Sequence, residues 1–147
     1  MALDPQPTQP YRILVIAADE VKIQCLGAVL QRTHFRLCAS FTSGSLAVNH
    51  SQSYAPDVAI VDLALPEDFD AVETVRVLRD RFNIPVVLMT DADDAESLAR
   101  ADSLGDVTCL YLPLGETQLK QAVIAAMYRH CSEQHAELLA APPRIVR

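Results

Sequence analysis

The stretch "RILVIAADE", residues 12–20, establishes the pattern that the rest of the chain repeats. Its four successive apolar residues, 13–16, predict a short strand that is buried on both faces. Two alanines follow, and then Asp19 and Glu20, whose negative charges favour the start of a helix. A buried strand that leads directly into a helix is the repeating unit of an α/β fold.

The alternation of apolar runs and helical patterns continues to the end of the chain. Further apolar runs occupy residues 36–41, 58–63, 85–89 and 109–113. Apolar residues recur at helical spacing over 19–33, 42–52, 70–82, 91–105 and 115–141. Ser43 and Asp70 are positioned to cap helix starts, and Gly105 is a typical helix exit. This (βα)5 order predicts a doubly wound five-stranded parallel sheet of flavodoxin-like strand order 2-1-3-4-5.

The length of 147 residues, half of them apolar, favours one domain with a substantial core. We expect residues 1–10, which contain three prolines, to be a flexible lead rather than a signal peptide. The domain proper is expected over 11–131, and residues 132–147 are expected to extend the last helix as a linker or dimer segment. No apolar run is long enough to cross a membrane.

Charge and cysteine usage exclude several classes of function. The net charge of -7 disfavours direct binding to nucleic acid, because phosphate backbones repel an acidic surface. The four cysteines form no CxxC pair, which favours free thiols in a reducing cytoplasm. The chain has no HxxxH, HExxH, GxGxxG or Walker motif, so metal ligation by histidines and nucleotide binding have little support.

Polar residues at the carboxyl ends of the predicted strands are the candidates for function, because ligands of such sheets bind there. Asp62 closes an otherwise apolar run, where an unpaired carboxylate costs several kcal/mol. Thr90 follows the fourth strand, and Leu112 and Pro113 end the fifth. An acidic residue at a buried strand end therefore needs solvent, a charge partner or hydrogen bonds.

The ordered segments "ILVI" with its turn, "PDVAIVDLALP", "IPVVLMT" and "LYLP" resemble the receiver domain of bacterial response regulators. The resemblance covers residues 12 to about 130. The segment "VETVRVLRDRFNIPVVLMTDADDAESLARA", with "AAMYRH" further on, resembles a subgroup linked to PAS and histidine kinase signalling proteins. The resemblance implies that Asp62 matches the phosphoacceptor, Thr90 the switch hydroxyl and Pro113 a proline that follows a cis peptide bond.

The chain departs from the family pattern where that pattern supplies charge. The acidic pair that holds Mg²⁺ in the family falls on Ala17 and Ala18, and the lysine after the fifth strand falls on Leu112. The aromatic switch falls on Cys109, although Tyr111 lies on the same face of the strand. Each departure removes a group that phosphoryl transfer needs.

Two carboxylates, Asp62 and Asp19, remain as weak metal candidates. Asp19 would enter the site only if the first strand shifted by one residue. The resemblance therefore implies a degenerate receiver that has no catalytic residue, is not an enzyme and needs no cofactor. It is expected to act by phosphorylation-independent contact with a protein partner or a second copy, through the fourth helix, fifth strand and fifth helix.

Two alternatives stay open. In the first, Asp62 still accepts a phosphoryl group with an unusual shell of ligands around Mg²⁺. In the second, the vacated acidic pocket has become a less charged cavity that senses a small ligand.

Overall fold

The structure is a computed structural model that describes residues 10–65, 70–91, 95–105, 107–113 and 115–140. Its strands are β1 (Arg12–Ile16), β2 (Arg36–Phe41), β3 (Val58–Asp62), β4 (Val86–Asp91) and β5 (Thr108–Leu112). Its helices are α1 (Glu20–Leu30), α2 (Gly44–Tyr54), α3 (Ala71–Arg76), α4 (Ala95–Ala101) and α5 (Glu116–Ala140). The π-helical turn η2 (Val77–Arg81) follows α3, and the 3-10 turn η3 (Asp102–Leu104) follows α4.

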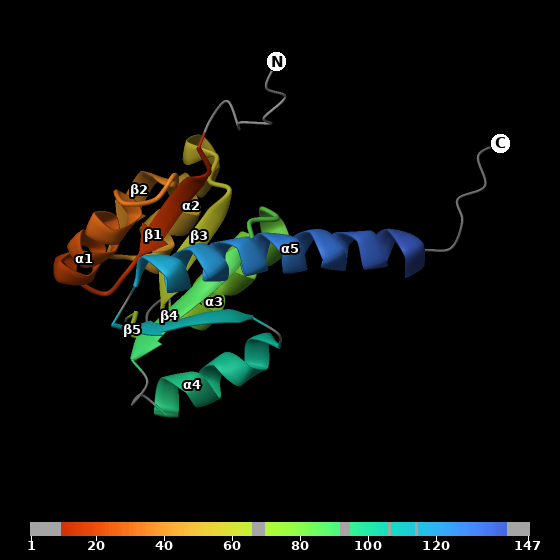
Figure 1. The fold of residues 1–147 in the computed structure, drawn as a ribbon. Coiled ribbons are helices and arrows are strands. Elements are labelled where there is room, and N and C mark those ends of the chain that lie inside the picture. Colours follow the sequence, from red (N-terminus) through yellow and green to blue (C-terminus); the bar gives the residue numbers. More distant parts are fainter. Residues whose placement is uncertain (1–9, 66–69, 92–94, 106, 114, 141–147) are drawn as a thin grey trace, which may run out of the picture.

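All strands are parallel and their order is β2-β1-β3-β4-β5, which confirms the predicted flavodoxin-like topology (Figure 1). In β1, Ile13 lies opposite Val58 and Ile16 opposite Val61 of β3. Because the strands are parallel, their carboxyl ends meet at one edge of the sheet. That edge carries the residues singled out from the sequence.

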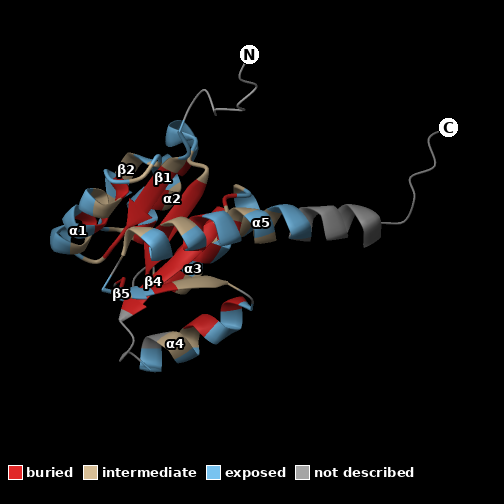
Figure 2. Ribbon diagram, in the orientation of Figure 1, coloured by how far each residue is buried: buried red, intermediate tan, exposed pale blue. Residues whose placement is uncertain are grey.

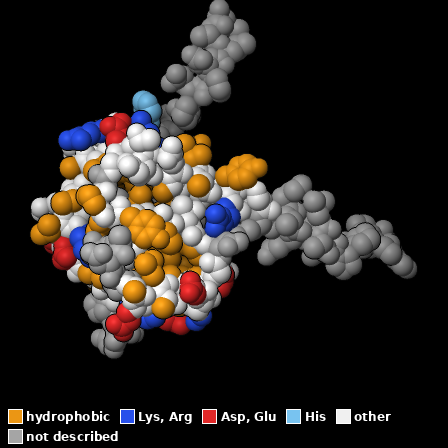
Figure 3. All heavy atoms as spheres, turned by 60° about the horizontal axis from the view of Figure 1, so that its bottom comes forward, with side chains coloured by type: hydrophobic (Ala, Val, Ile, Leu, Met, Phe, Trp, Pro, Cys, Tyr) orange, Lys and Arg blue, Asp and Glu red, His pale blue; other side chains and the backbone are white. Residues whose placement is uncertain are grey.

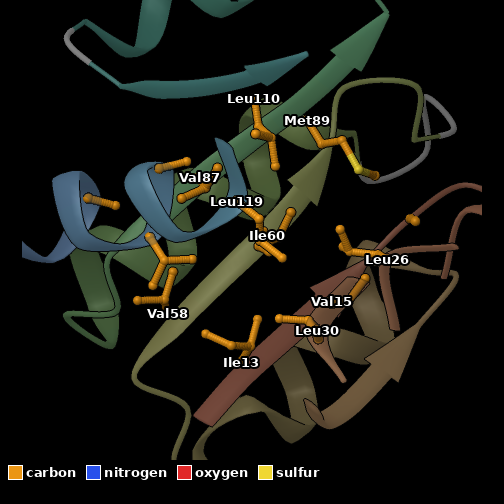
Figure 4. Packing of buried hydrophobic residues seen from close by; sticks show 14 of the residues in the cluster. Ile13, Val15, Leu26, Leu30, Val58, Ile60, Val87, Met89, Leu110 and Leu119 are labelled. Carbon is orange, nitrogen blue, oxygen red and sulfur yellow. The ribbon is translucent and has the colours of Figure 1, made fainter. Parts of the chain in front are cut away.

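Helices cover both faces of the sheet, and each face has its own hydrophobic core. Alternate strand residues such as Ile13 and Val15 pack with α1 and α5, as Figure 4 shows for one of the two clusters. Their neighbours Leu14 and Ile16 pack with α2, α3 and α4 on the other face. The central strands are therefore buried on both sides, which explains their uninterrupted apolar sequence (Figure 2).

Short side chains begin the helices as the sequence predicts. Ser43 Oγ accepts a hydrogen bond from the backbone N–H of Leu46 at the start of α2. Asp70 Oδ1 accepts one from Glu73 at the start of α3. Gly105, with a φ of 77°, follows η3 and takes the backbone conformation that glycine tolerates best.

Element boundaries differ from the sequence prediction by a few residues, and two of the differences are larger or concern a site residue. The helix predicted over 70–82 is α-helical only to Arg76 and then takes the wider turn η2. Strand β4 continues through Thr90 and Asp91, because these residues pair with Tyr111 and Leu112 of β5. Thr90 therefore belongs to the strand and is held by the sheet.

The two chain ends were predicted to be a flexible lead (1–10) and a helix extension (132–147). Residues 1–9 and 141–147 lie outside the described residues. The last helix, α5, does continue past residue 131 to Ala140 and runs beyond the sheet (Figure 1). Among the described helices, none is both long enough and apolar enough to cross a bilayer.

Candidate functional site at the strand ends

Asp62 is the last residue of β3, and only 1% of it is exposed. Its Oδ1 accepts a hydrogen bond from the backbone N–H of Ala64 at 2.9 Å. Its Oδ2 accepts one from the backbone N–H of Ala18, also at 2.9 Å. The loops after β1 and β3 thus supply the donors that a buried carboxylate requires.

A third donor comes from Lys22 in the first turns of α1. Its Nζ lies 3.0 Å from Asp62 Oδ2, and its side chain is 22% exposed whereas that of Asp62 is 2% exposed. Side chains on a helix lean toward its N-terminus, so a lysine three residues past the cap can reach back over the strand ends. Lys22 therefore neutralises Asp62 at the edge where receivers bind their metal ion.

Lys22 is the functional residue that sequence reasoning missed. The one signal in the sequence is its place four residues after Ala18, on the helix that starts at the vacated acidic positions. A buried carboxylate is stable only with a cation or hydrogen-bond donors beside it. Asp62 has both.

The positions of the missing acidic pair hold no oxygen ligand. Ala17 is fully buried in the core beside α1 and α5, and Ala18 contributes only its backbone N–H to Asp62. Exposed Asp19, the other weak metal candidate, caps α1, and its Oδ1 accepts a hydrogen bond from the backbone N–H of Lys22 at 2.9 Å.

These residues do not fit a site for Mg²⁺. A hard cation needs several oxygen ligands, whereas here the two positions of the acidic pair are alanines and Oδ2 of Asp62 already holds an ammonium group. Within the described part of the chain, no group of three or more histidine, cysteine or acidic side chains is placed to hold a metal ion.

The ends of β4 and β5 complete the site. Thr90 is 3% exposed and lies opposite Tyr111 of β5. Leu112, at the position of the family's lysine, packs partly buried against the core that contains Leu119. The peptide bond between Leu112 and Pro113 is cis, as the resemblance implies. On this side of the site, the apolar side chain of Leu112 therefore stands where the family has a positively charged lysine.

Cys109 and Tyr111, the two candidates for the switch residue on β5, differ in their exposure to solvent. Half-buried Cys109 packs against the core formed with α2, α3 and α4, whereas Tyr111 on the same strand is 48% exposed. Burial raises the pKa of the Cys109 thiol, against a weaker opposing effect of the Arg129 guanidinium. Cys109 therefore stays a neutral packing group at physiological pH.

Large hydrophobic side chains are exposed on β5 and α5. Tyr111 on β5 and Ile124 and Tyr128 on α5 are 48%, 58% and 75% exposed. Figure 3 shows hydrophobic side chains massed on the side of the molecule that lies at the bottom of Figure 1. Exposed apolar areas on soluble proteins are often the surfaces that contact other molecules.

A parallel (βα)5 sheet with a buried aspartate ending β3 and a buried threonine near the end of β4 defines a receiver-type signalling domain. The chain belongs to the response regulator receiver domain family, which it matches over residues 13–124. It is thus a receiver of the two-component signalling type, and receivers are in general signalling domains rather than enzymes.

Solved receiver structures share the fold. The signal receiver domain of a modulated diguanylate cyclase from Desulfovibrio desulfuricans has a TM-score of 0.76 at 24% identity, over 85% of this chain and 99% of that one. The signal receiver domain of an HD domain-containing protein from Pseudomonas fluorescens has a TM-score of 0.70 at 21% identity, over 84% of this chain and 99% of that one.

Curated relatives are longer than this chain. The DNA-binding response regulator MtrA of Mycolicibacterium smegmatis is 28% identical, over 90% of this chain and 57% of its own length. The heme response regulator HssR of Staphylococcus epidermidis is 26% identical, over 80% of this chain and 51% of its own length. The chain therefore spans about half the length of the curated relatives that it matches.

Proposed function

We propose that this domain is a degenerate receiver that signals without being phosphorylated, through contact with a partner protein or a second copy. The observation that carries the proposal is the ion pair between Lys22 and Asp62. It gives the retained aspartate a cation from the protein itself, at the place where the family binds Mg²⁺. The losses at Ala17, Ala18 and Leu112 support the same conclusion.

Phosphoryl transfer to Asp62 would meet two obstacles. The carboxylate must attack phosphorus, but Oδ2 is engaged by Lys22 and Ala18, and Oδ1 by Ala64. The transferred charge also needs cations around it, and the metal ligands and the family's lysine are replaced by carbon. Each lost element is commonly worth a few kcal/mol, so transfer should be slower by several orders of magnitude.

The same ion pair also supports a second candidate function. Lys22 is a cation 3.0 Å from the acceptor oxygen, and Thr90 keeps a hydroxyl group near the site. A lysine in this place would offset part of the phosphoryl charge and let Asp62 accept a phosphoryl group with an unusual metal shell or without a metal ion.

One experiment decides between these functions. The protein is incubated with acetyl phosphate and Mg²⁺, and its intact mass is measured beside a receiver that keeps the acidic pair and the lysine. We expect no phosphoryl adduct here and a clear one on the control. An adduct that forms on the wild type and disappears in Asp62→Asn would refute the degenerate receiver. Loss of that adduct in Lys22→Met would assign the lysine as its cation.

The proposed contact surface comprises α4, β5 and α5. Support comes from the exposed side chains of Tyr111, Ile124 and Tyr128 and from the apolar area in Figure 3. We place this contact in a reducing cytoplasm, where the four cysteines, unpaired in the structure, remain thiols.

The small-ligand alternative, which the sequence assigns to the vacated acidic pocket at Ala17 and Ala18, draws its support from a hollow that these two residues do not line. A hollow open to solvent, of about 520 Å³, runs along β5 and is lined by Cys109, Tyr111, Leu112 and Gln118 among others. It adjoins the position that lost its lysine. Co-purification of a small molecule whose binding is abolished in Leu112→Lys, and not in the surface variant Gln52→Lys, would establish this alternative.

A further inference from the structure

Strand β5 forms one edge of the sheet, and its outer side has no partner within the described part of the chain. It pairs with β4 alone, over five successive residue pairs that end at Leu112 (Figure 1). Among the described residues, no hydrogen bond outside this ladder uses a backbone group of residues 108–112. Every second residue of an edge strand directs its N–H and C=O groups away from the sheet, so β5 offers donors and acceptors to another strand.

The two edges of the sheet differ in the features that discourage such pairing. At the other edge, β2 begins with exposed Arg36, and its register against β1 shifts by one residue between Leu37 and Ala39. Charges and irregularities of this kind keep natural edge strands from adding to another sheet. Strand β5, with the sequence TCLYL, contains neither a charge nor a proline, and its pairing with β4 is regular. The β5 edge is therefore the one that favours strand addition.

The surface beside the β5 edge carries no charge. The hollow of about 520 Å³ along β5 is lined by all of the strand and by α5 residues that include Gln121, and none of the described lining residues is charged. Gln121 also borders a second hollow, which continues along α5 past Ile124 and Tyr128. The strand edge and the exposed hydrophobic side chains of α5 thus form one continuous surface, in a chain whose net charge of -7 keeps copies apart elsewhere.

We propose that β5 pairs with β5 of a second copy in antiparallel fashion, so that the two sheets join into one across a twofold axis. The proposal rests on the contact surface of the proposed function, and it adds that main-chain hydrogen bonds make the contact. Two identical antiparallel edges are self-complementary, since each copy donates to acceptors of the other. The uncharged edges gain partners without bringing like charges together.

The same symmetry would bring the two α5 helices together. Helix α5 packs on one face of the sheet, over β3, β4 and β5. A twofold axis perpendicular to the sheet leaves both copies of α5 on the same face, on either side of the junction. Paired strands lie about 4.8 Å apart and packed helices about 8–10 Å apart, so helices set back by about one strand have room to meet. Ile124 and Tyr128, 58% and 75% exposed, would then be covered.

The test observes β5 directly in the wild-type protein. Sedimentation velocity gives the equilibrium between monomer and dimer, and NMR follows amide hydrogen exchange below and above its midpoint. We expect every second amide in 108–112 to exchange at least about tenfold more slowly in the dimer. In a mixture of labelled and unlabelled protein, isotope-filtered NOEs should connect β5 strands of different copies. A dimer without these signals, or a monomer at all concentrations, overturns the proposal.

Tyr111→Lys tests the edge by giving it a charge of the kind that β2 carries. Lysines on two paired edges repel each other, so we expect the dimer to weaken at least about tenfold while circular dichroism shows an unchanged fold. Tyr11→Lys is the matched control, because Tyr11 is 42% exposed against 48% for Tyr111 and precedes β1, which β3 and β4 separate from β5. It should leave the dimer intact. Equal weakening in both variants would refute pairing at β5.

Strand pairing and the proposed function can fail separately. If Asp62 takes up a phosphoryl group from acetyl phosphate while β5 shows the expected exchange and NOEs, the degenerate receiver is refuted and strand pairing stands. If no adduct forms and the dimer lacks the β5 signals, strand pairing is refuted and the proposed function stands with a different contact.

Discussion

Lys22 and Asp62 form the contact on which the local chemistry of this domain depends. The carboxylate is almost fully buried, and its ammonium partner keeps limited access to water. Removing one member of such a pair leaves a buried charge uncompensated, which is costly even where the intact pair adds little. The two backbone donors from Ala18 and Ala64 reduce that cost without replacing the positive charge.

At this scale we predict that Lys22→Met destabilises the domain by about 2 kcal/mol, less than for a fully buried pair because Lys22 is partly exposed. Urea denaturation monitored by circular dichroism measures the change. The control is Lys120→Met, which breaks an exposed pair with Glu116 on α5 and should cost at most about 0.5 kcal/mol. Equal effects of the two variants would contradict the buried role of Lys22.

The double variant Lys22→Met with Asp62→Asn tests the coupling itself. Removing the carboxylate charge together with its cation should restore part of the lost stability, because neither partner is then left alone. Simple addition of the two single effects would show that Lys22 and Asp62 do not depend on each other.

At the level of the elements, single side chains determine where three helices begin. Asp19, Ser43 and Asp70 each accept a hydrogen bond from a backbone N–H three residues further on, at the starts of α1, α2 and α3. These bonds satisfy donors that the first helical turn leaves unpaired. The Asp19 cap also sets where α1 begins, and thereby where Lys22 meets Asp62.

At this scale Ser43→Ala is expected to cost about 1 kcal/mol, since it removes the acceptor for the Leu46 N–H. Ser45→Ala, an exposed position within the first turn of the same helix, is expected to be neutral or slightly stabilising. Thermal denaturation of both variants provides the comparison. A larger loss in Ser45→Ala would contradict the assignment of Ser43 as the cap.

At the scale of the whole molecule, the exposed hydrophobic side chains of β5 and α5 bear on association. Figure 3 shows hydrophobic side chains gathered on the side of the molecule that lies at the bottom of Figure 1. Large side chains project there from two neighbouring elements, while the net charge of -7 keeps the molecule repulsive elsewhere. A homodimer or a partner protein would cover this area.

At this scale we predict a concentration-dependent dimer in sedimentation velocity, which Tyr128→Glu should convert to monomer. A carboxylate at the centre of an apolar contact carries a desolvation cost, so the dimer should weaken by at least about tenfold. Val21→Glu, at a site on α1 that is 67% exposed, is the matched control and should leave the dimer intact. If the protein is a monomer at all concentrations, the homodimer is refuted, and the surface would contact a different protein.

The sequence by itself determined the fold and the principal departures from the family pattern. Apolar runs, helical spacing and capping residues are local properties, so the strands, the helices and the caps Ser43 and Asp70 followed from them. The strand order followed from the βα alternation and the general rules for parallel sheets. The identities at Ala17, Ala18 and Leu112 are likewise visible without coordinates. Two features resisted local reasoning, namely the change to a π-helical turn after Arg76 and the extension of β4 through Asp91.

Only the tertiary structure decided what replaced the lost charges. Lys22 and Asp62 are 40 residues apart, and their contact depends on the rotation of α1 about its axis and on the register of β1 against β3. This arrangement leaves no spacing motif in the chain, because it arises where separate elements pack together.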